Sequence, residues 1–203
     1  MPSQFKYDKY KACRNIRFRI LEYAVEDERF VSLFDQIAQV IKAAEQACEK
    51  AVASGNEDYI EAVCDDEAEN IEEAIGVTFL ILQTKIRRVV DAAADLFPKQ
   101  QDPKDILGTH DNKPHSLIKL IWELANYYKH RDEWSASVWH AEKGKGVSTR
   151  KVVETVGVMT ASTGNLRTAL ENLGISRYSE CTQLATHVQR WAEKILEKGK
   201  SVS

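Results

Sequence analysis

Apolar residues recur every three or four positions along most of the chain, which is the spacing of one face of an α-helix. The stretch Ser116–Trp134 shows this pattern most clearly, with apolar residues over a broad arc: Leu117, Ile118, Leu120, Ile121, Trp122, Leu124, Ala125 and Tyr128. A polar strip follows the opposite side at spacing i, i+4, i+7 and i+11: Lys119, Glu123, Asn126 and His130. The pattern predicts a largely buried helix whose polar face is either a functional site or a solvated surface.

Similar stripes predict long helices before this stretch. A first helix is expected over Phe5–Tyr23, and a second begins at Asp27 and ends at the turn Ser54–Asn56. The buried stripe expected for the second helix is Phe30, Leu33, Phe34, Ile37, Ile41, Ala44, Cys48 and Val52. A third helix is expected from about Ile60 until Pro98, with a kink allowed at Gly76. Its segment VTFLIL (77–82) would also suit a strand, but the helical stripe continues on both sides.

Beyond the stretch 116–134, further helices are expected from about Ser148, Thr163 and Ser179. Because the periodicity is helical throughout, the fold class predicted is all-α, a single helical-bundle domain with long antiparallel helices over residues 1–203. Its core helices span about 27–134, and the C-terminal helices, about 148–198, pack on them.

Composition supports a folded, helical chain. Of 203 residues, nine are glycine and four are proline, fewer than a turn-rich β fold needs. No apolar run reaches membrane-spanning length and the N-terminus lacks a secretory signal pattern, so a cytoplasmic protein without membrane contact is expected. Residues 1–76 contain nine basic against seventeen acidic residues, a balance of −8, whereas residues 77–203 contain nineteen against fourteen, a balance of +5. The second part could therefore take an anionic partner.

The loop that follows the 116–134 stretch is the most basic loop of the chain, and two lysines lie on or beside the polar strip. The candidate binding residues are Lys119, Glu123, Lys129, Lys143, Lys145, Arg150 and Lys151. Residues 57–73 carry nine carboxylates, which could hold a divalent cation but more often form a solvated helix face. The four cysteines lie apart without zinc spacing, and neither a metal nor a cofactor is expected.

The segment LANYYKHRDEW (124–134) resembles the signature region of the HEPN superfamily of small helical domains. In that family an arginine, a polar residue, three variable positions and a histidine occupy the C-terminal part of a bundle helix. Here Asn126 matches the polar residue and His130 the histidine. The resemblance implies either a metal-independent ribonuclease or a non-catalytic module that binds RNA or a partner protein. Many such proteins belong to toxin–antitoxin or phage-defence systems and act as homodimers.

The chain departs from the family pattern at Ala125, which occupies the position of the arginine. In the family, the histidine handles a proton and the arginine neutralises charge that develops on the phosphate. Arg131 follows the histidine but projects about 100° away from it on a continuing helix. Candidate catalytic residues are Asn126, His130 and Arg131, with enzymatic activity disfavoured by Ala125.

Three hypotheses therefore stay open. The chain is a non-catalytic HEPN-like module, a ribonuclease that uses His130, or an unrelated helical protein-interaction module. No sequence motif of another enzyme class is present. A partner protein encoded nearby is conceivable, and a homodimer is expected, with Ile118, Trp122 and Ala125 facing the second subunit.

Overall fold

A computed structural model of the protein describes residues 28–93, 107, 116–134, 136–144, 146–160 and 162–201, with backbone alone at 28, 29, 136, 137 and 196–201. The first predicted helix, over residues 5–23, and the predicted loop 98–115 except Leu107 lie outside the described residues. The elements are α2 (Glu28–Ser54), α3 (Glu57–Ala93), α5 (Leu117–His130), η1 (Arg131–Glu133), α6 (Ala136–His140), α7 (Val147–Val153), η2 (Glu154–Val156), α8 (Asn165–Asn172), η3 (Tyr178–Gln183) and α9 (Leu184–Ser201). The protein is all-α, as predicted, and the described residues form no strand.

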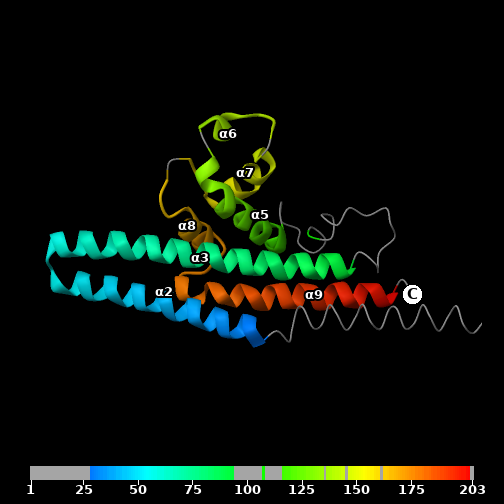
Figure 1. The fold of residues 1–203 in the computed structure, drawn as a ribbon, viewed down its shortest axis with the longest axis horizontal. Coiled ribbons are helices and arrows are strands. Elements are labelled where there is room, and N and C mark those ends of the chain that lie inside the picture. Colours follow the sequence, from blue (N-terminus) through cyan, green and yellow to red (C-terminus); the bar gives the residue numbers. More distant parts are fainter. Residues whose placement is uncertain are drawn as a thin grey trace, which may run out of the picture.

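The two long helices, α2 and α3, form an antiparallel hairpin (Figure 1). The turn between them has Gly55 in the left-handed conformation, with φ of 67°, and the side-chain oxygen of Asn56 accepts from the Tyr59 amide at 3.1 Å. Asn56 thereby satisfies one amide at the start of α3 that has no partner within the helix. Residues 77–82 lie inside α3, which continues through Gly76, so the helical prediction for VTFLIL is confirmed.

Burial along the hairpin is uneven. Within α3, the fully or nearly buried side chains begin at Ile71 and continue to Ala93, whereas residues 57–70 contain none. In α2, Phe34, Ile37, Ile41 and Ala44 are buried as predicted. The prediction was wrong for Leu33 and Val52, which are 38% and 60% exposed. Both lie on the predicted apolar stripe, but α3 covers one side of α2 and these residues face elsewhere.

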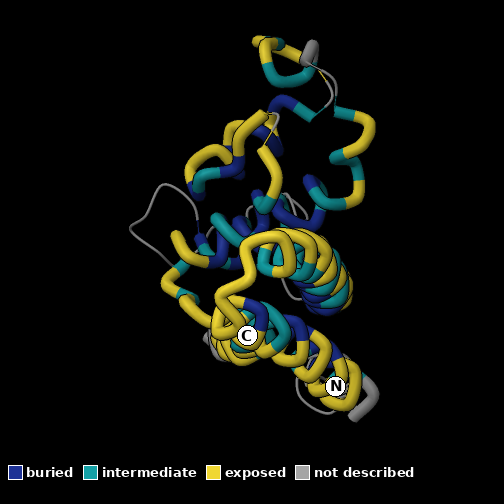
Figure 2. The backbone as a smooth tube through the Cα atoms, turned by 90° about the vertical axis from the view of Figure 1, so that its left-hand side faces the viewer, coloured by how far each residue is buried: buried dark blue, intermediate teal, exposed yellow. Residues whose placement is uncertain are grey.

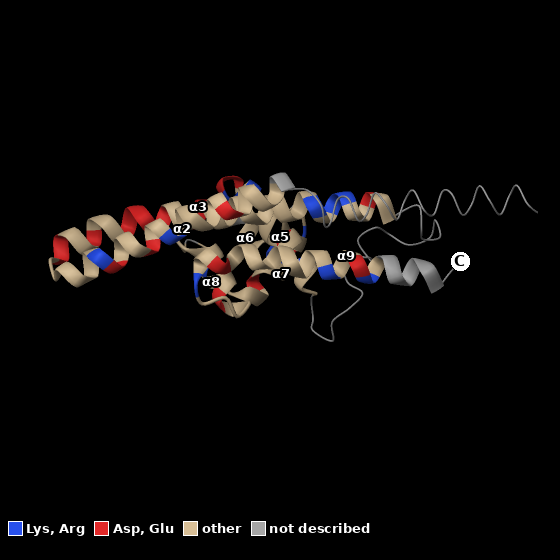
Figure 3. Cartoon of the chain, turned by 90° about the horizontal axis from the view of Figure 1, so that it is seen from below, with Lys and Arg blue, Asp and Glu red and all other residues tan. Residues whose placement is uncertain are grey.

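The remaining helices pack on one end of the hairpin, so that its turn end projects beyond them (Figure 1). Helix α5 lies across α3 and also contacts α7 and α9, while η3 packs on α2. The dark blue residues of Figure 2 lie where these elements meet. Acidic residues follow the projecting part of the hairpin, and lysines and arginines gather toward the far ends of α3 and α9 (Figure 3).

Two carboxylates of the hairpin bind the backbone of the C-terminal segment. Glu72 accepts hydrogen bonds from the amides of Leu166 and Arg167, at 2.7 and 3.2 Å, at the start of α8. Glu45 accepts from the amides of Tyr178 and Ser179, at 2.9 and 3.4 Å, at the start of η3. Because the first amides of a helix have no partner inside it, each glutamate stabilises a helix that the hairpin also covers.

Burial overturns the argument that one face of α5 is open to a second subunit. Ile118 is 5% exposed and Ala125 is fully buried within this chain, while Trp122 is half-buried. The homodimer stays a prediction, without that face to support it. Among the described helices we find no segment with the length and apolar character to cross a lipid bilayer.

Candidate functional site at the end of helix α5

Helix α5 starts at a side-chain cap and ends at the candidate histidine. The hydroxyl oxygen of Ser116 accepts from the Lys119 amide at 3.1 Å, and the hydroxyl donates to the carbonyl of Leu107. Two turns beyond Lys119 the helix reaches Asn126, and His130 is the last residue of the α-helix. Arg131 already belongs to the short helix η1, which turns the chain away from the axis of α5.

Asn126 and Glu123 belong to a hydrogen-bond network that joins three helices. The Asn126 amide donates to Glu123 at 3.0 Å and its oxygen accepts from Gln83 of α3 at 2.8 Å. The Thr149 hydroxyl of α7 donates to the same Glu123 oxygen at 2.7 Å. Lys129 donates to the Gln83 oxygen at 2.9 Å. The network therefore holds α3, α5 and α7 together, which is a structural role.

His130 differs from its neighbours because it is largely free of this network. Its side chain is 41% exposed, and its Nδ1 atom lies 3.2 Å from a carboxylate oxygen of Glu133. None of the described residues hydrogen-bonds its Nε2 atom. His130 lines a cavity of about 290 Å³ together with Asn126, Glu133, Trp134, Val138, Gly146 and Thr149. The structure thus brings His130 and Asn126 to one cavity, as their spacing predicts.

Trp134, which lines this cavity, belongs to a cluster of three aromatic rings. The Trp134 ring centroid lies 5.3 Å from that of Tyr127 and 5.4 Å from that of Trp139, each in an edge-to-face arrangement. Tyr127 is in turn held by the buried amide of Asn165, which donates to its hydroxyl at 2.8 Å. Edge-to-face aromatic packing of this kind fixes the orientation of each ring. The indole of Trp134 is therefore a rigid part of the cavity.

Arg131 lies in a separate cluster. Its guanidinium donates to Glu73 of α3 and lies over the Tyr128 ring, 4.7 Å from the ring centroid. The Tyr128 hydroxyl donates to the other Glu73 oxygen at 2.6 Å. The ring of Tyr128 packs against the backbone of Gly76, where a Cβ atom would come within 2.1 Å of the ring. The absent side chain at Gly76 thus makes room for Tyr128, and no helix kink is needed to explain the glycine.

Charges within this cluster shift the pKa of each member. Burial raises the pKa of the Glu73 carboxyl, but the hydrogen bonds from Tyr128 and Arg131 outweigh burial and hold it below its usual value. Burial and the Glu73 carboxylate raise the pKa of Tyr128 to about 12. Burial lowers the pKa of Arg131, but Glu73 raises it further than burial lowers it. Arg131 is a cation committed to Glu73, and it is not available to His130.

The position that holds arginine in the HEPN pattern is closed here. Ala125 is fully buried in the core that α5 forms with α3 and α7. A guanidinium at this position would have to enter the apolar core, because the methyl group of Ala125 has no exposed surface. The alanine at position 125 therefore serves the packing of this core.

The candidate basic residues of the following segment divide into two groups. Lys143 and Lys151 are exposed, Lys119 is half-buried, and Lys145 lies outside the described residues. Arg150, which the sequence analysis named as a binding residue, is 9% exposed. Its guanidinium donates to the carbonyls of Val138, at 2.9 Å, and Trp139, and lies 3.5 Å from Glu154. Arg150 therefore holds α6 against α7. Counting charges along the sequence cannot show whether an arginine makes such a contact or is exposed to solvent.

Several residues of the site come from outside the predicted motif. Gln83 is polar in the apolar run LILQTKI, and this interruption is a signal that the sequence offered. Thr149, Gly146 and Glu73 carried no such signal, because their proximity to α5 depends on how distant segments fold together. Within the described ranges, no three histidine, cysteine or acidic side chains converge to hold a metal ion.

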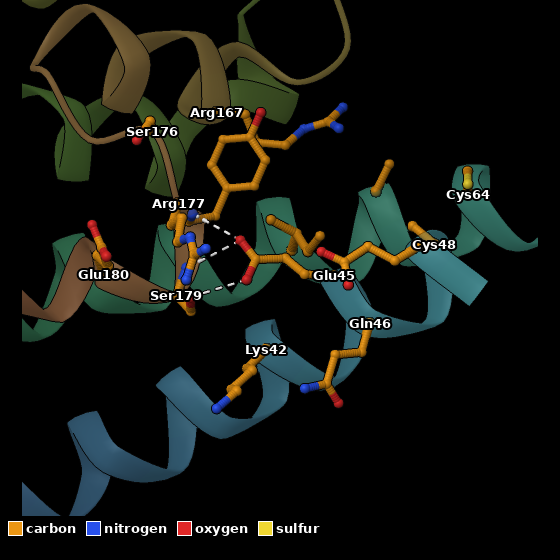
Figure 4. Close-up of a pocket in the computed structure, with 14 residues that line it drawn as sticks. Lys42, Glu45, Gln46, Cys48, Cys64, Arg167, Ser176, Arg177, Ser179 and Glu180 are labelled. Atoms are coloured by element: carbon orange, nitrogen blue, oxygen red, sulfur yellow. Dashed lines mark hydrogen bonds between the residues drawn. The ribbon is translucent and has the colours of Figure 1, made fainter. Parts of the chain in front are cut away.

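A second cavity, of about 700 Å³, lies between α2, the first half of α3 and the segment before η3 (Figure 4). Residues from both hairpin helices line it, including Lys42, Cys48 and Cys64, and Arg167 of α8 and Arg177 before η3 line it from the other elements. Glu45 enters from α2 and its carboxylate is already bound to the start of η3 (Figure 4). No sequence motif predicted this cavity.

Comparisons with protein-family models, with curated protein sequences and with solved structures find no match to this chain. The site must therefore be interpreted from its own geometry.

Proposed function

We propose that this protein is a non-catalytic, HEPN-like module that binds single-stranded RNA at the end of α5. The observation that carries the proposal is the cavity of about 290 Å³, in which a half-exposed histidine and a fixed indole lie beside hydrogen-bonding side chains. Proteins recognise unpaired bases by stacking them on aromatic side chains and by hydrogen bonds to their edges. A single base fits a cavity of this size, and Trp134 and His130 supply the two kinds of contact.

The flanking charges suit a nucleic-acid backbone. Lys143 and Lys151 are exposed on the segments that precede and follow Gly146, which itself lines the cavity. Lysines on such a segment can neutralise phosphates on either side of a bound base, and that contribution to affinity falls as salt rises. The Nδ1 atom of His130 lies beside Glu133, which leaves its Nε2 atom to hydrogen-bond a base edge or a phosphate.

Catalysis is disfavoured because the charge-stabilising group is missing at the histidine. Ala125 is buried, and Arg131 is bound to Glu73 and Tyr128 on the α3 side. RNA cleavage by a histidine alone would lack the stabilisation of developing phosphate charge that usually contributes most to such reactions. Binding without cleavage is therefore the expected behaviour.

The test is fluorescence anisotropy with a labelled single-stranded RNA of mixed sequence, with an RNA duplex for comparison. We expect the single strand to bind more tightly, and His130→Ala to weaken it by about tenfold, as the loss of one base contact does. His187→Ala is the matched control, because His187 is exposed on α9 away from the cavity. Equal weakening by both substitutions, or no binding by the wild type, would contradict the proposal.

Salt dependence tests the lysines separately. The double substitution Lys143→Ser and Lys151→Ser should reduce the slope of log affinity against log salt by about 1.4, because two phosphates of the single strand lose their cationic partners. The matched double substitution Lys50→Ser and Lys194→Ser removes two exposed lysines from α2 and α9 and should leave the slope unchanged.

The same samples decide between binding and the ribonuclease alternative. Wild-type protein is incubated with the RNA in EDTA and the products are separated on a denaturing gel. We expect intact RNA. Cleavage in EDTA that His130→Ala abolishes would establish the ribonuclease alternative. Failure to bind RNA with the fold intact would favour the protein-interaction alternative.

A further inference from the structure

Cys48 and Cys64 occupy matching positions on the two helices of the hairpin. Each lies eight residues from Asn56 in the turn, Cys48 before it in α2 and Cys64 after it in α3. Both helices rise by about 1.5 Å per residue, so residues at equal distance from the turn of an antiparallel hairpin lie at the same level. The two cysteines are therefore neighbours across the α2–α3 interface, although the end of α2, the turn and the start of α3 separate them in the sequence.

The spacing of packed helices suits a bond between these positions. Helix axes packed about 8–10 Å apart, each with Cα atoms about 2.3 Å from its axis, place directly facing Cα atoms about 3.4–5.4 Å apart. Disulfides join residues whose Cα atoms are about 4.4–6.8 Å apart. Small residues flank this level of the hairpin, among them Ala44, Ala51 and Ala68, which lets the two backbones approach closely.

The thiols are also accessible. Both are half-buried and both line the cavity of about 700 Å³, at the end away from Glu180 (Figure 4). Cys181 provides the contrast, because it is fully buried and its sulfur lies 3.6 Å from the Thr78 hydroxyl in the core. All three described cysteines are free thiols in this structure. A small reagent that enters the cavity therefore reaches Cys48 and Cys64 but not Cys181.

We propose that Cys48 and Cys64 form a redox-active dithiol that closes reversibly to an intramolecular disulfide. The oxidant is a low-molecular-weight disulfide of the glutathione class. One thiolate attacks the reagent, releases one reduced thiol and forms a mixed disulfide, and the second thiolate displaces the other reduced thiol. Two S–H bonds of the protein and the S–S bond of the reagent break, one S–S bond forms within the protein, and the reagent takes two electrons and two protons and leaves as two thiols.

The thiol chemistry sets the rate. Burial and the neighbouring Cys64 raise the pKa of Cys48 to about 11, so its thiolate is scarce at neutral pH. Ring closure should therefore accelerate as pH rises. The bond would close a short loop around the projecting end of the hairpin, where residues 57–70 contain no buried side chain. This end of the molecule should lose its local opening motions when the bond forms.

The experiment uses the full chain, reduced and then freed of reductant, with oxidised glutathione at about pH 8 as the probe, so that more thiolate is present than at neutral pH. Remaining thiols are alkylated under denaturing conditions, and protease fragments are identified by mass spectrometry without reduction. We expect a fragment pair that joins Cys48 to Cys64 with the loss of two hydrogen atoms and no added glutathione. Amide exchange between the two cysteines should slow by on the order of 100-fold on oxidation.

Substitutions distinguish the pair from the other cysteines. Cys48→Ser and Cys64→Ser should each block the cross-link and leave a glutathione adduct on the remaining partner. Cys13→Ser is the matched control that keeps the pair, and the cross-link should persist. Stable glutathione adducts on both cysteines of the wild type, a cross-link to Cys13 or Cys181, or a disulfide between two chains would each overturn the proposal.

Discussion

Residues 57–70 and residues 71–93 belong to one continuous helix, α3, but side chains are fully or nearly buried in the second part alone. Ile75, Phe79, Leu82 and Ile86 are fully buried beneath α5 and α9, whereas the first part contacts chiefly α2. Both parts carry the same kind of apolar stripe in the sequence. An apolar stripe therefore predicts a helix and the side of it that is buried. How many other helices cover that side depends on distant segments of the chain.

Glutamates show the same contrast. In the first part of α3 most are exposed, and in the second Glu72 caps α8 while Glu73 binds Arg131 and Tyr128. A run of nine carboxylates therefore contains both solvated side chains and structural ones. Four substitutions or measurements test this contrast, and they are ordered here by the size of the expected effect.

Gly76→Ala should have the largest effect. A Cβ atom at residue 76 would lie 2.1 Å from Cε2 of Tyr128, and Glu73 and Arg131 hold that ring in place. We expect a loss of about 3 kcal/mol in the free energy of unfolding, the upper end of the usual cost of overpacking, despite the better helix propensity of alanine. Urea denaturation measures it. The double variant Gly76→Ala/Tyr128→Ala should lose less free energy of unfolding than the sum of the two single losses, by at least about 1 kcal/mol, as expected for residues in contact.

Glu72→Ala should cost about 1–2 kcal/mol, because the amides of Leu166 and Arg167 lose their partner at the start of α8. Glu69→Ala is the matched control in the first part of α3, since Glu69 is exposed, and it should change stability by no more than about 0.5 kcal/mol. Thermal or urea unfolding of both variants checks the pair. Similar losses for Glu69→Ala and Glu72→Ala would remove the contrast between the two parts of α3.

Acid stability should separate Glu72 from Glu73. The pKa of Glu73 is lower in the folded protein than its ordinary value of 4.5, so the stabilisation it gives is complete above that value and is lost as pH falls through the folded-state pKa. Burial raises the pKa of Glu72, so its contribution has the opposite sign and declines as pH rises above 4.5.

Unfolding by urea between about pH 3 and pH 7 measures both contributions. Glu73→Gln should show a smaller loss of stability on acidification than the wild type. Glu72→Gln should show a smaller decline as pH rises from 4.5. Curves for both variants parallel to the wild type would show that these carboxyls titrate alike in the folded and unfolded chain.

Val52→Ala should have the smallest effect. Val52 is 60% exposed near the turn of the hairpin, so its truncation should change the free energy of unfolding by no more than about 0.5 kcal/mol. Sedimentation of the same variant adds a second readout. A loss of more than about 1 kcal/mol in the free energy of unfolding, which corresponds to burial of at least one methylene group, would indicate that another surface covers the projecting end in solution.

The sequence was sufficient for the long helices α2 and α3 and for α5, since each spans several turns and its apolar spacing is a local property, whereas the five-residue helix α6 was not predicted. The end of α2 followed from the turn at 54–56, where Gly55 has the left-handed conformation that glycine adopts without strain. The placement of Asn126 and His130 on one face also followed from spacing, and both line one cavity. Such predictions succeed because helical geometry relates residues a few positions apart.

The roles of individual charged residues were less accessible. Arg150, Arg131 and Glu73 look like surface charges in the sequence, yet each binds a partner from another segment. Leu33 and Val52 look like core residues and are exposed. The type of a side chain, charged or apolar, does not determine whether it is buried, because burial depends on which elements pack over it.

By itself, then, the sequence determined the all-α class, the long hairpin and the polar strip of α5. Tertiary structure decided that Asn126 and Glu123 bind neighbouring helices, that His130 borders a cavity and that Arg131 turns to Glu73. The physical reason is the range of the interactions. Helix formation depends on neighbours within a turn or two, whereas a hydrogen-bond partner is selected by the packing of helices far apart in the chain.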